Sequence, residues 1–498
     1  AGGGNNTASG AYSNVAGGYG NTASSLYSNV AGGDNNNALS DYSNVAGGGN
    51  NTASGAYSNV AGGANNVTMC NHSNVAGGST NSALSACSTV SGGSGNTASG
   101  NYSNVAGGDN NTASGLRSNV AGGVDNTASG PYSNVAGGDN NTTSGDTSTI
   151  AGGVDNTASG SCSNVAGGSN NTASCTYSNV AGGSTNSALS ACSTVSGGAS
   201  NEADNIYATV AGGSTNTASG SASNVGGGEN NCARGPNSNV GGGENNKACG
   251  DYSNVAGGQD NTASGFYTTV GGGQQNTVYH AYSTVAGGYI NRACCNYANI
   301  AGGSGNCTFG SWSSIGGGGN NTTCCNYSTI AGGCSNFATG SCTTIAGGGF
   351  NGAYGSFANI AGGYCNAACC SYSTIAGGCG NKICGNVSNV AGGACNTVCG
   401  VTSNVGGGFC NIASGDCANV AGGEENVASG DYSNVTGGCS NTVQTAHSAS
   451  AIIGSTGITS VSGSMTHMSR MFANDLPTSD PGVTGVLWND AGSVKISL

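Results

Sequence analysis

The stretch AGGGNNTASGAYSNV, Ala1–Val15, sets the pattern for most of this chain. Its 15 positions recur thirty times, from Ala1 to Ser450, without an inserted or deleted residue. A fixed short period over so much of a chain is typical of a solenoid or fibre, in which each repeat contacts mainly its neighbours. Such a chain has no obvious place for a deep active site. We therefore expect a mechanical or adhesive role, with no enzyme activity, catalytic residue, cofactor or metal site.

Composition narrows the class of protein and its partners. The chain has 98 Gly in 498 residues, 4 Pro, and 5% charged residues. Four prolines are too few for collagen, and a disordered chain would not keep a perfect period. The balance of 7 Lys+Arg against 20 Asp+Glu argues against a nucleic-acid partner. No run of 18 apolar residues occurs, so no membrane insertion is expected.

The repeat positions differ sharply in what they accept. With the Ala of AGG as position 1, position 15 is Val or Ile in twenty-nine of thirty repeats, Ser450 being the exception. Position 8 is Ala, Thr, Val or Ile, positions 2 and 3 are always Gly, and position 6 is always Asn. Positions 4, 5, 7, 9 and 11 accept charged or bulky residues such as Glu202, Arg234 and Lys382. Positions 8 and 15 are therefore predicted to form the core, and the tolerant positions to face solvent.

The repeat predicts an all-β fold. Two Gly in every repeat would each cost a helix about 1 kcal/mol. The repeat instead divides into two halves, each read as a strand of three to five residues ending at a Gly-containing turn. We predict a parallel β-solenoid of thirty 15-residue turns over residues 1–450, with two strands per turn.

The invariant Asn and Gly positions have structural explanations. Stacked turns would let each Asn bond the equivalent Asn above and below, and Asn tolerates left-handed backbone at a turn. The predicted structural Asn ladder includes Asn6, Asn21, Asn36 and Asn51. The Gly pair at positions 2 and 3 suits positive φ or a close backbone approach.

The strand that ends at position 15 predicts an oligomer. Successive strand residues point to opposite faces, so position 1 should face outwards if position 15 faces inwards. Yet position 1 is only Ala, Gly, Ser or Thr. A strand restricted on both faces, over a thin core, suggests that the second face is buried in a subunit interface. We expect a homotrimer.

Tyr occupies position 12 in fifteen of thirty repeats, on the outward side by the same alternation. The candidate surface-contact ladder comprises Tyr12, Tyr27, Tyr42, Tyr57, Tyr102 and Tyr132. Two interpretations stay open. The rings could contact a host receptor or glycan, or they could simply cover the edge of the turn or pack between subunits; the second is the better supported, because unlike residues replace Tyr freely.

The chain has 24 Cys, and 17 of them follow residue 290. Cys369, Cys384 and Cys399 share position 9 of successive repeats, and Cys395 and Cys410 share position 5. A spacing of about 4.8 Å between neighbouring turns falls inside the Cα range of a disulfide. These residues could form disulfides between turns, or Cys could be a small tolerated side chain. Adjacent Cys pairs lack the C-x-x-C spacing of zinc sites.

The motifs N-T-A-S-G (Asn6–Gly10) and S-N-V-A-G-G (Ser13–Gly18) resemble the YadA-like head repeats of trimeric autotransporter adhesins, S-x-A-x-G-x-x-S-V-A-I-G. The resemblance covers residues 1–450. It implies a trimeric, left-handed parallel β-roll that adheres to host surfaces. The Ile of that consensus is Gly17 here, which thins the core.

Residues 451–498 lack the heptads of an adhesin stalk. Instead Leu476–Ser497 resembles a segment that recurs in tailed-phage and other virion structural proteins. It predicts a turn at Thr478–Gly482 and a hairpin across Asn489–Gly492, with Trp488 as its anchor. The two resemblances together suggest a virion fibre or spike, at the virion surface or extracellular. Residues 1–450 would form the shaft, and residues 451–498 a small β-rich cap or docking segment.

Other functions remain open. A secreted bacterial adhesin or a self-assembling extracellular filament would use the same rod, with an end-to-end partner in place of a virion. An ice-binding solenoid is weakened because the Thr at position 7 is interrupted, for example at Asn37, Val67, Glu202 and Lys247.

Overall fold

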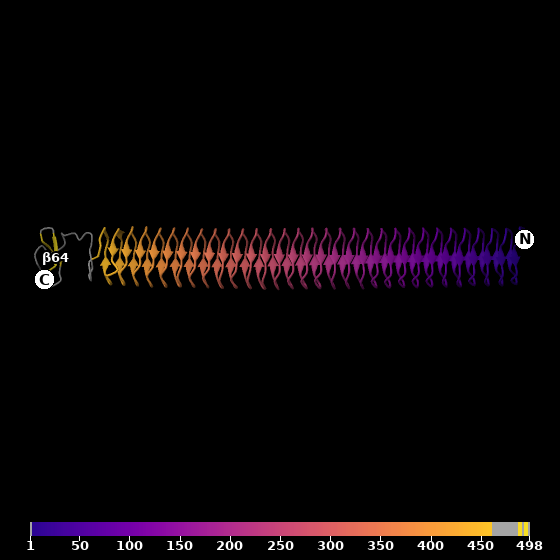
Figure 1. Cartoon of the computed structure of the whole chain (residues 1–498), viewed down its shortest axis with the longest axis horizontal. Helices are drawn as coiled ribbons and strands as arrows, with labels where there is room; N and C mark the ends of the chain where they lie inside the picture. Colours follow the sequence, from indigo (N-terminus) through magenta and orange to yellow (C-terminus); the bar gives the residue numbers. More distant parts are fainter. Residues whose placement is uncertain (1, 461–486, 491–492, 497–498) are drawn as a thin grey trace. The chain divides into compact units, whose positions relative to one another are not determined.

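The computed structural model describes residues 2–460, 487–490 and 493–496. They form an all-β parallel β-solenoid of about thirty turns, with about 15 residues per turn and no helix among the described residues. The predicted fold class is therefore confirmed. We call one turn a coil. The chain divides into two compact units, unit 1 (Ala1–Val278) and unit 2 (Tyr279–Leu498), and coils follow one another along the sequence within each unit (Figure 1). The described part of the chain offers no helix that could cross a membrane.

Each coil contains two short strands. In the first coil these are β1 (Thr7–Ala8) and β2 (Asn14–Val15). The same two strands recur every 15 residues as far as β57 (Val427–Ala428) and β58 (Asn434–Val435). Every strand whose pairing is described in this series is parallel to its equivalent in the next coil and in register with it, as Val30 is with Val45. Identical positions therefore stack in columns.

The strands have two residues, not the three to five predicted. Positive φ angles at positions 3, 5 and 12 interrupt the extended chain, for example at Gly18 (φ 91), Asn35 (φ 55) and Tyr27 (φ 54). A third contact between coils compensates in part. Position 4 forms isolated parallel bridges, such as Tyr19 with Asp34. Each coil is thus joined to the next at three places around its circumference.

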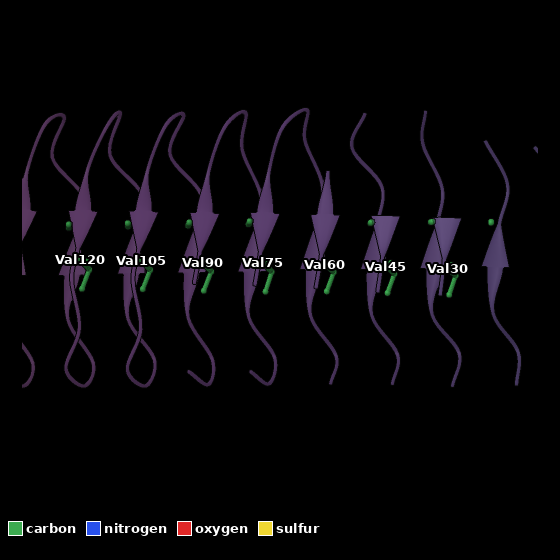
Figure 2. Close-up of a cluster of buried hydrophobic side chains, with 14 of the residues drawn as sticks. Val30, Val45, Val60, Val75, Val90, Val105 and Val120 are labelled. Atoms are coloured by element: carbon green, nitrogen blue, oxygen red, sulfur yellow. The ribbon is translucent and has the colours of Figure 1, made fainter. Parts of the chain in front are cut away.

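The core is a set of four columns. Val and Ile at position 15 and Ala at position 8 are fully buried, as Val30 and Ala23 show, which confirms the predicted core. Figure 2 shows the position-15 side chains from Val30 to Val120 following one another along unit 1. Two polar columns share the interior: Asn at position 6 and mostly Ser at position 13, such as Asn36 and Ser43. The interior is therefore half polar.

The two glycines of the A-G-G motif have different roles. At position 3, Gly33 has φ +94, and a Cβ there would overlap the carbonyl oxygen of Gly48 in the next coil. At position 2, a Cβ on Gly32 would meet nothing within 4 Å. The predicted requirement for positive φ and close approach is confirmed at position 3, where only glycine fits.

The last coils depart from the strict period. Strand β60 (Thr442–Val443) keeps the 15-residue spacing, but β61 (Ala451–Ile452) pairs with β58 at a spacing of 17 residues. Ile452, not Ser450, consequently continues the position-15 column, and it is fully buried. The pairing goes on through β59 (Gly438–Cys439) with β62 (Ser455–Thr456). The solenoid thus extends past residue 450.

The remaining described strands lie near the carboxyl end. β63 (Leu487–Asp490) and β64 (Ser493–Ile496) pair antiparallel, where the sequence predicts a hairpin. The predicted turn at Thr478–Gly482 and the Trp488 side chain lie outside what the structure describes. The role of this segment as a cap or docking element stays a prediction.

Candidate functional site

The position-6 asparagines, predicted as a ladder, are buried from Asn21 onwards, with Asn6 half-buried, and link three segments each. The Nδ2 group of Asn36 donates to the carbonyl oxygens of Gly32, 2.9 Å away in its own coil, and Gly48, 2.8 Å away in the next. The Oδ1 atom of Asn36 accepts from the backbone N–H of Asn51 at 2.9 Å. The same pattern holds at Asn6, Asn21 and Asn51. The column is structural, because each amide joins backbone groups of its own coil to backbone groups of the next coil.

Two details of that prediction are corrected. The main bond between neighbouring asparagines runs from a backbone N–H to a side-chain oxygen; an amide-to-amide bond is added only in some coils, as from Asn216 to Asn201 at 3.1 Å. The predicted left-handed backbone at position 6 is wrong: among the described coils, the positive φ belongs to position 5, as at Asn35 and Asn50. The side chain of position 6 turns inwards from a residue with ordinary backbone.

An amide ladder of the expected kind exists at position 14, which sequence reasoning missed. Asn14 donates to Asn29, Asn29 to Asn44, and Asn44 to Asn59, with Nδ2–Oδ1 distances of 2.9, 2.8 and 2.7 Å. This ladder lies on the outer face of the even-numbered strands and is half-buried. The available signal was the restriction of position 14 to Asn, Thr and Ser through most of the repeats.

The tyrosines at position 12 form a stack. The ring centroids of Tyr12, Tyr27, Tyr42 and Tyr57 are separated by 4.9, 5.1 and 4.7 Å, with interplanar angles of 9, 18 and 3°. His72 continues the stack 5.1 Å from Tyr57. The exposed fraction runs from 43% at Tyr42 to 77% at Tyr12. The predicted outward column is therefore present in these coils.

Stacking decides which part of these rings a ligand can reach. A sugar that binds an aromatic residue usually lies against the ring face, but in this stack the faces cover one another. Only ring edges and a row of hydroxyl groups remain open along the column. The arrangement suits lateral hydrogen bonding better than face-on stacking of a glycan.

Tyr102 and Tyr132 belong to a different arrangement from the first four tyrosines. Arg117 occupies position 12 between them, and its guanidinium carbon lies 5.6 Å from the centroid of each ring. The Nη1 group of Arg117 also donates to the Tyr132 hydroxyl at 3.4 Å. The cation thus takes the place of one ring in the column.

Unit 2 has shorter aromatic runs in the same column. Tyr297 lies between Tyr282 and Trp312, with centroid distances of 4.9 and 3.9 Å, and Phe357 stacks on Tyr372 at 4.8 Å. Tyr327 follows Trp312 at a centroid distance of 6.4 Å, and the other coils of the unit have Cys, Val, Thr, Tyr432 or His447 at position 12. The column is therefore interrupted, and no aromatic ladder runs the length of unit 2 in the described residues.

All 24 cysteines are free thiols, and each is half-buried or exposed. Cys294 and Cys307 approach with their Sγ atoms 3.9 Å apart. The hydrogen bond with Cys307 lowers the pKa of Cys294 to about 7, against the effect of burial and with help from the charge of Arg292. The pKa of Cys307 is raised by the same bond and by burial. The predicted disulfides among Cys369, Cys384, Cys399, Cys395 and Cys410 stay a prediction.

The small residues at position 1, which suggested an interface, are exposed in the single chain. Ala106 and Ala136 lie on the outer side of the chain beside the buried Val105 and Val135. Together with the Asn and Thr side chains of position 14 they form a face without bulky groups. We call it the small-residue face.

No family model matches this chain, and no curated protein matches it. What the structure supports is therefore a β-solenoid repeat fold, argued from its own columns.

Proposed function

We propose that this protein is the shaft of a virion fibre or spike, a homotrimeric rod that projects from a surface and presents attachment to a host. The observation that carries the proposal is the small-residue face. It stays free of bulky and charged side chains in coil after coil although it is exposed in one chain. Positions 4, 5, 7, 9 and 11, which are exposed to the same water, accept nearly any residue.

The fold supports a mechanical role. Each coil contacts mainly the coils next to it, so stability is built up by repetition, and within the described coils no loop is long enough to shape a deep site. Within unit 1 the 18 coils of β1–β36 rise about 4.8 Å each, or roughly 85 Å together. The resemblance to trimeric adhesin heads supports three chains. The resemblance of residues 476–497 to virion structural proteins supports a virion as the place of assembly.

Sedimentation of the full chain tests the assembly. We expect the mass of three chains, and Ala106→Arg on the small-residue face should reduce it to that of one chain. Asn101→Arg, at exposed position 11, is the matched control and should leave the trimer intact. A monomer before any substitution would contradict the proposal. Immunogold labelling of purified particles tests the virion assignment, and rods found only free of particles would favour an adhesin or filament.

One observation favours ice binding as a second candidate. In unit 1, six successive coils carry Thr at position 7 in register, and each has Ser two residues later. The threonines are Thr97, Thr112, Thr127, Thr142, Thr157 and Thr172. Such a regular array of hydroxyl and methyl groups could order water. Thermal hysteresis that disappears in Thr127→Tyr would support this function, and its absence from the unmodified protein would exclude it.

A further inference from the structure

Unit 2 contains a column of three thiols. Cys369, Cys384 and Cys399 occupy position 9 of three successive coils. The backbone N–H of Cys369 donates to the carbonyl oxygen of Ile383 at 2.8 Å, and that of Cys384 to Val398 at 2.7 Å. These bonds hold each Cys beside its equivalent in the next coil. The thiols are partly open to water.

The separation of equivalent atoms can be read from the aromatic stacks. Phe357 and Tyr372, which occupy position 12 of successive coils, have centroids 4.8 Å apart and planes 6° apart. Side chains in one column are thus nearly parallel copies displaced by about 4.8 Å. A disulfide needs Cβ atoms about 3.5–4.5 Å apart. A disulfide within the column would therefore require the two coils to be pinched together.

The same separation fits a different link. A metal–thiolate bond is about 2.3 Å long, so a cation held in line between two thiolates spans roughly 4.6 Å. Thiolates select soft cations such as copper(I). We propose that Cys384, with Cys369 or Cys399, binds a soft monovalent cation of the copper(I) class in a linear two-thiolate site. The pair Cys395 and Cys410, stacked at position 5, forms a second site of the same kind.

A zinc-type site is not the alternative. Among the described residues, no group of three or more His, Cys, Asp or Glu side chains is suited to hold a metal ion. A cation that accepts two ligands fits the column, in which the position-9 thiols of neighbouring coils follow one another. The nearby Cys370 thiol donates instead to the carbonyl oxygen of Cys384 at 2.7 Å. The number of ligands separates copper(I), which accepts two, from zinc, which binds four.

The surrounding charges are compatible with the two sites. Two thiolates and one monovalent cation leave a net charge of −1. Lys382 lies two residues from Cys384 on the same side of the chain, and its charge acts on Cys369 and Cys399, whose pKa values are nevertheless raised, chiefly by burial. Near the second site, Glu424 and Glu425 are the nearby charges that act on Cys410. Their acidic side chains favour an approaching cation.

Binding must displace protons from the thiols. Two thiols and one cation form one two-thiolate complex and release two protons. No oxidation state changes in this reaction. Because a thiol must lose its proton to become a metal ligand, the apparent affinity should rise with pH. The expected increase approaches about a hundredfold per pH unit, the limit for release of two protons.

The test is a titration of the reduced full chain with copper(I) under anaerobic conditions, against bicinchoninate as competitor. Cys384→Ser breaks both pairs in its column and should weaken binding there by roughly a hundredfold or more, since one thiolate is left without a partner. Cys369→Ser leaves the Cys384–Cys399 pair in place, so this variant should still bind one copper(I) ion tightly. Cys342→Ser, whose column neighbours are Tyr327 and Phe357, should change nothing.

Three results would overturn the proposal. The first is equal loss of copper for every Cys→Ser variant, which would mean nonspecific thiol binding. The second is an X-ray absorption spectrum with three or more sulfur ligands per ion. The third is formation of a Cys384 disulfide under oxidised glutathione at neutral pH with both coils still folded by circular dichroism. A two-sulfur shell near 2.2–2.3 Å, lost in Cys384→Ser, supports it.

Discussion

Units 1 and 2 are built on the same 15-residue frame but differ in where they vary. In the core, position 15 is Val in most of unit 1 and Ile in a run of unit 2 coils, a change of one methylene, and position 8 of unit 2 includes Ile383 and Val398 where most coils have Ala. The Ile residues of that run are Ile300, Ile315, Ile330, Ile345, Ile360 and Ile375. On the outside the units diverge widely, with a tyrosine stack in unit 1 and 17 of the 24 Cys in unit 2.

This difference between the units shows which columns stabilise the fold and which can vary without changing it. Buried columns accept only a few uncharged residue types, as at position 8, which is Ala, Thr, Val or Ile, because neighbouring coils leave little space. Outward columns carry rings, thiols or charges without altering the coil. The following predictions test that division.

The largest effect is expected from the glycine at position 3. Gly33→Ala places a Cβ against the Gly48 carbonyl at a residue with φ +94. It should destabilise the adjoining coils by at least about 3 kcal/mol. Gly32→Ala, with open space at its Cβ, is the matched control and should be close to neutral. Hydrogen exchange of the neighbouring amides measures the effect, and equal exchange in the two variants would refute the assignment of position 3.

The buried Asn column should matter more than the exposed one. Asn51→Ala removes bonds from Nδ2 to Gly47 and Gly63 at 2.9 Å and leaves the N–H of Asn66 unpaired. The expected loss is about 3 kcal/mol, since the unpaired groups are buried. Asn44→Ala breaks only half-buried side-chain bonds and should cost about 1 kcal/mol. Urea unfolding followed by circular dichroism compares the two, and a larger loss in Asn44→Ala would contradict the account.

Thiol reactivity should distinguish the units. The pKa of Cys294 in unit 2 is lowered to about 7 by its hydrogen bond with Cys307, whereas burial raises the pKa of Cys249 in unit 1. The thiolate is the reactive form, so at pH 7 iodoacetamide should modify Cys294 roughly fiftyfold faster. Mass spectrometry across pH gives both midpoints. Cys307→Ala, which removes the donor, should move the Cys294 midpoint upwards, and an unchanged midpoint would count against the hydrogen bond as its cause.

The smallest effect is expected from the tyrosine stack. Tyr42→Ala removes two ring contacts, while Tyr177→Ala removes a ring whose column neighbours are Cys162 and Cys192. Both residues have positive φ, 56 and 58°, so the backbone contribution cancels. Tyr42→Ala should be more destabilising by about 1 kcal/mol, the usual value of stacking beyond burial. Equal thermal midpoints would show that the stack adds no stability.

Much of the coil structure could be predicted because the thirty repeats show which residue types each position accepts. Position 15 accepts only Val or Ile in all but one repeat, and this restriction identifies the core directly. The same comparison indicated that positions such as those of Arg234 and Lys382 face solvent. The structure places these side chains on the outside.

Other features could not be predicted from tolerance alone. An invariant Asn is equally compatible with a turn and with a buried bridge, so the inward direction of Asn36 was not evident. Positive φ at Tyr27 is uncommon for a residue with a Cβ, and this hid the two-residue length of the strands. The sequence also suggested that Ser450 replaces Val or Ile at position 15. In the structure two extra residues shift the chain, so that Ile452 continues that column.

The central claim is that equivalent residues of successive coils are separated by the same translation throughout each unit. X-ray diffraction from oriented full-length protein tests it most directly. The account predicts a strong reflection near 4.8 Å along the axis on which the coils of each unit stack, which is the spacing of parallel coils. A pattern with that spacing perpendicular to the axis, or without it, would contradict the account.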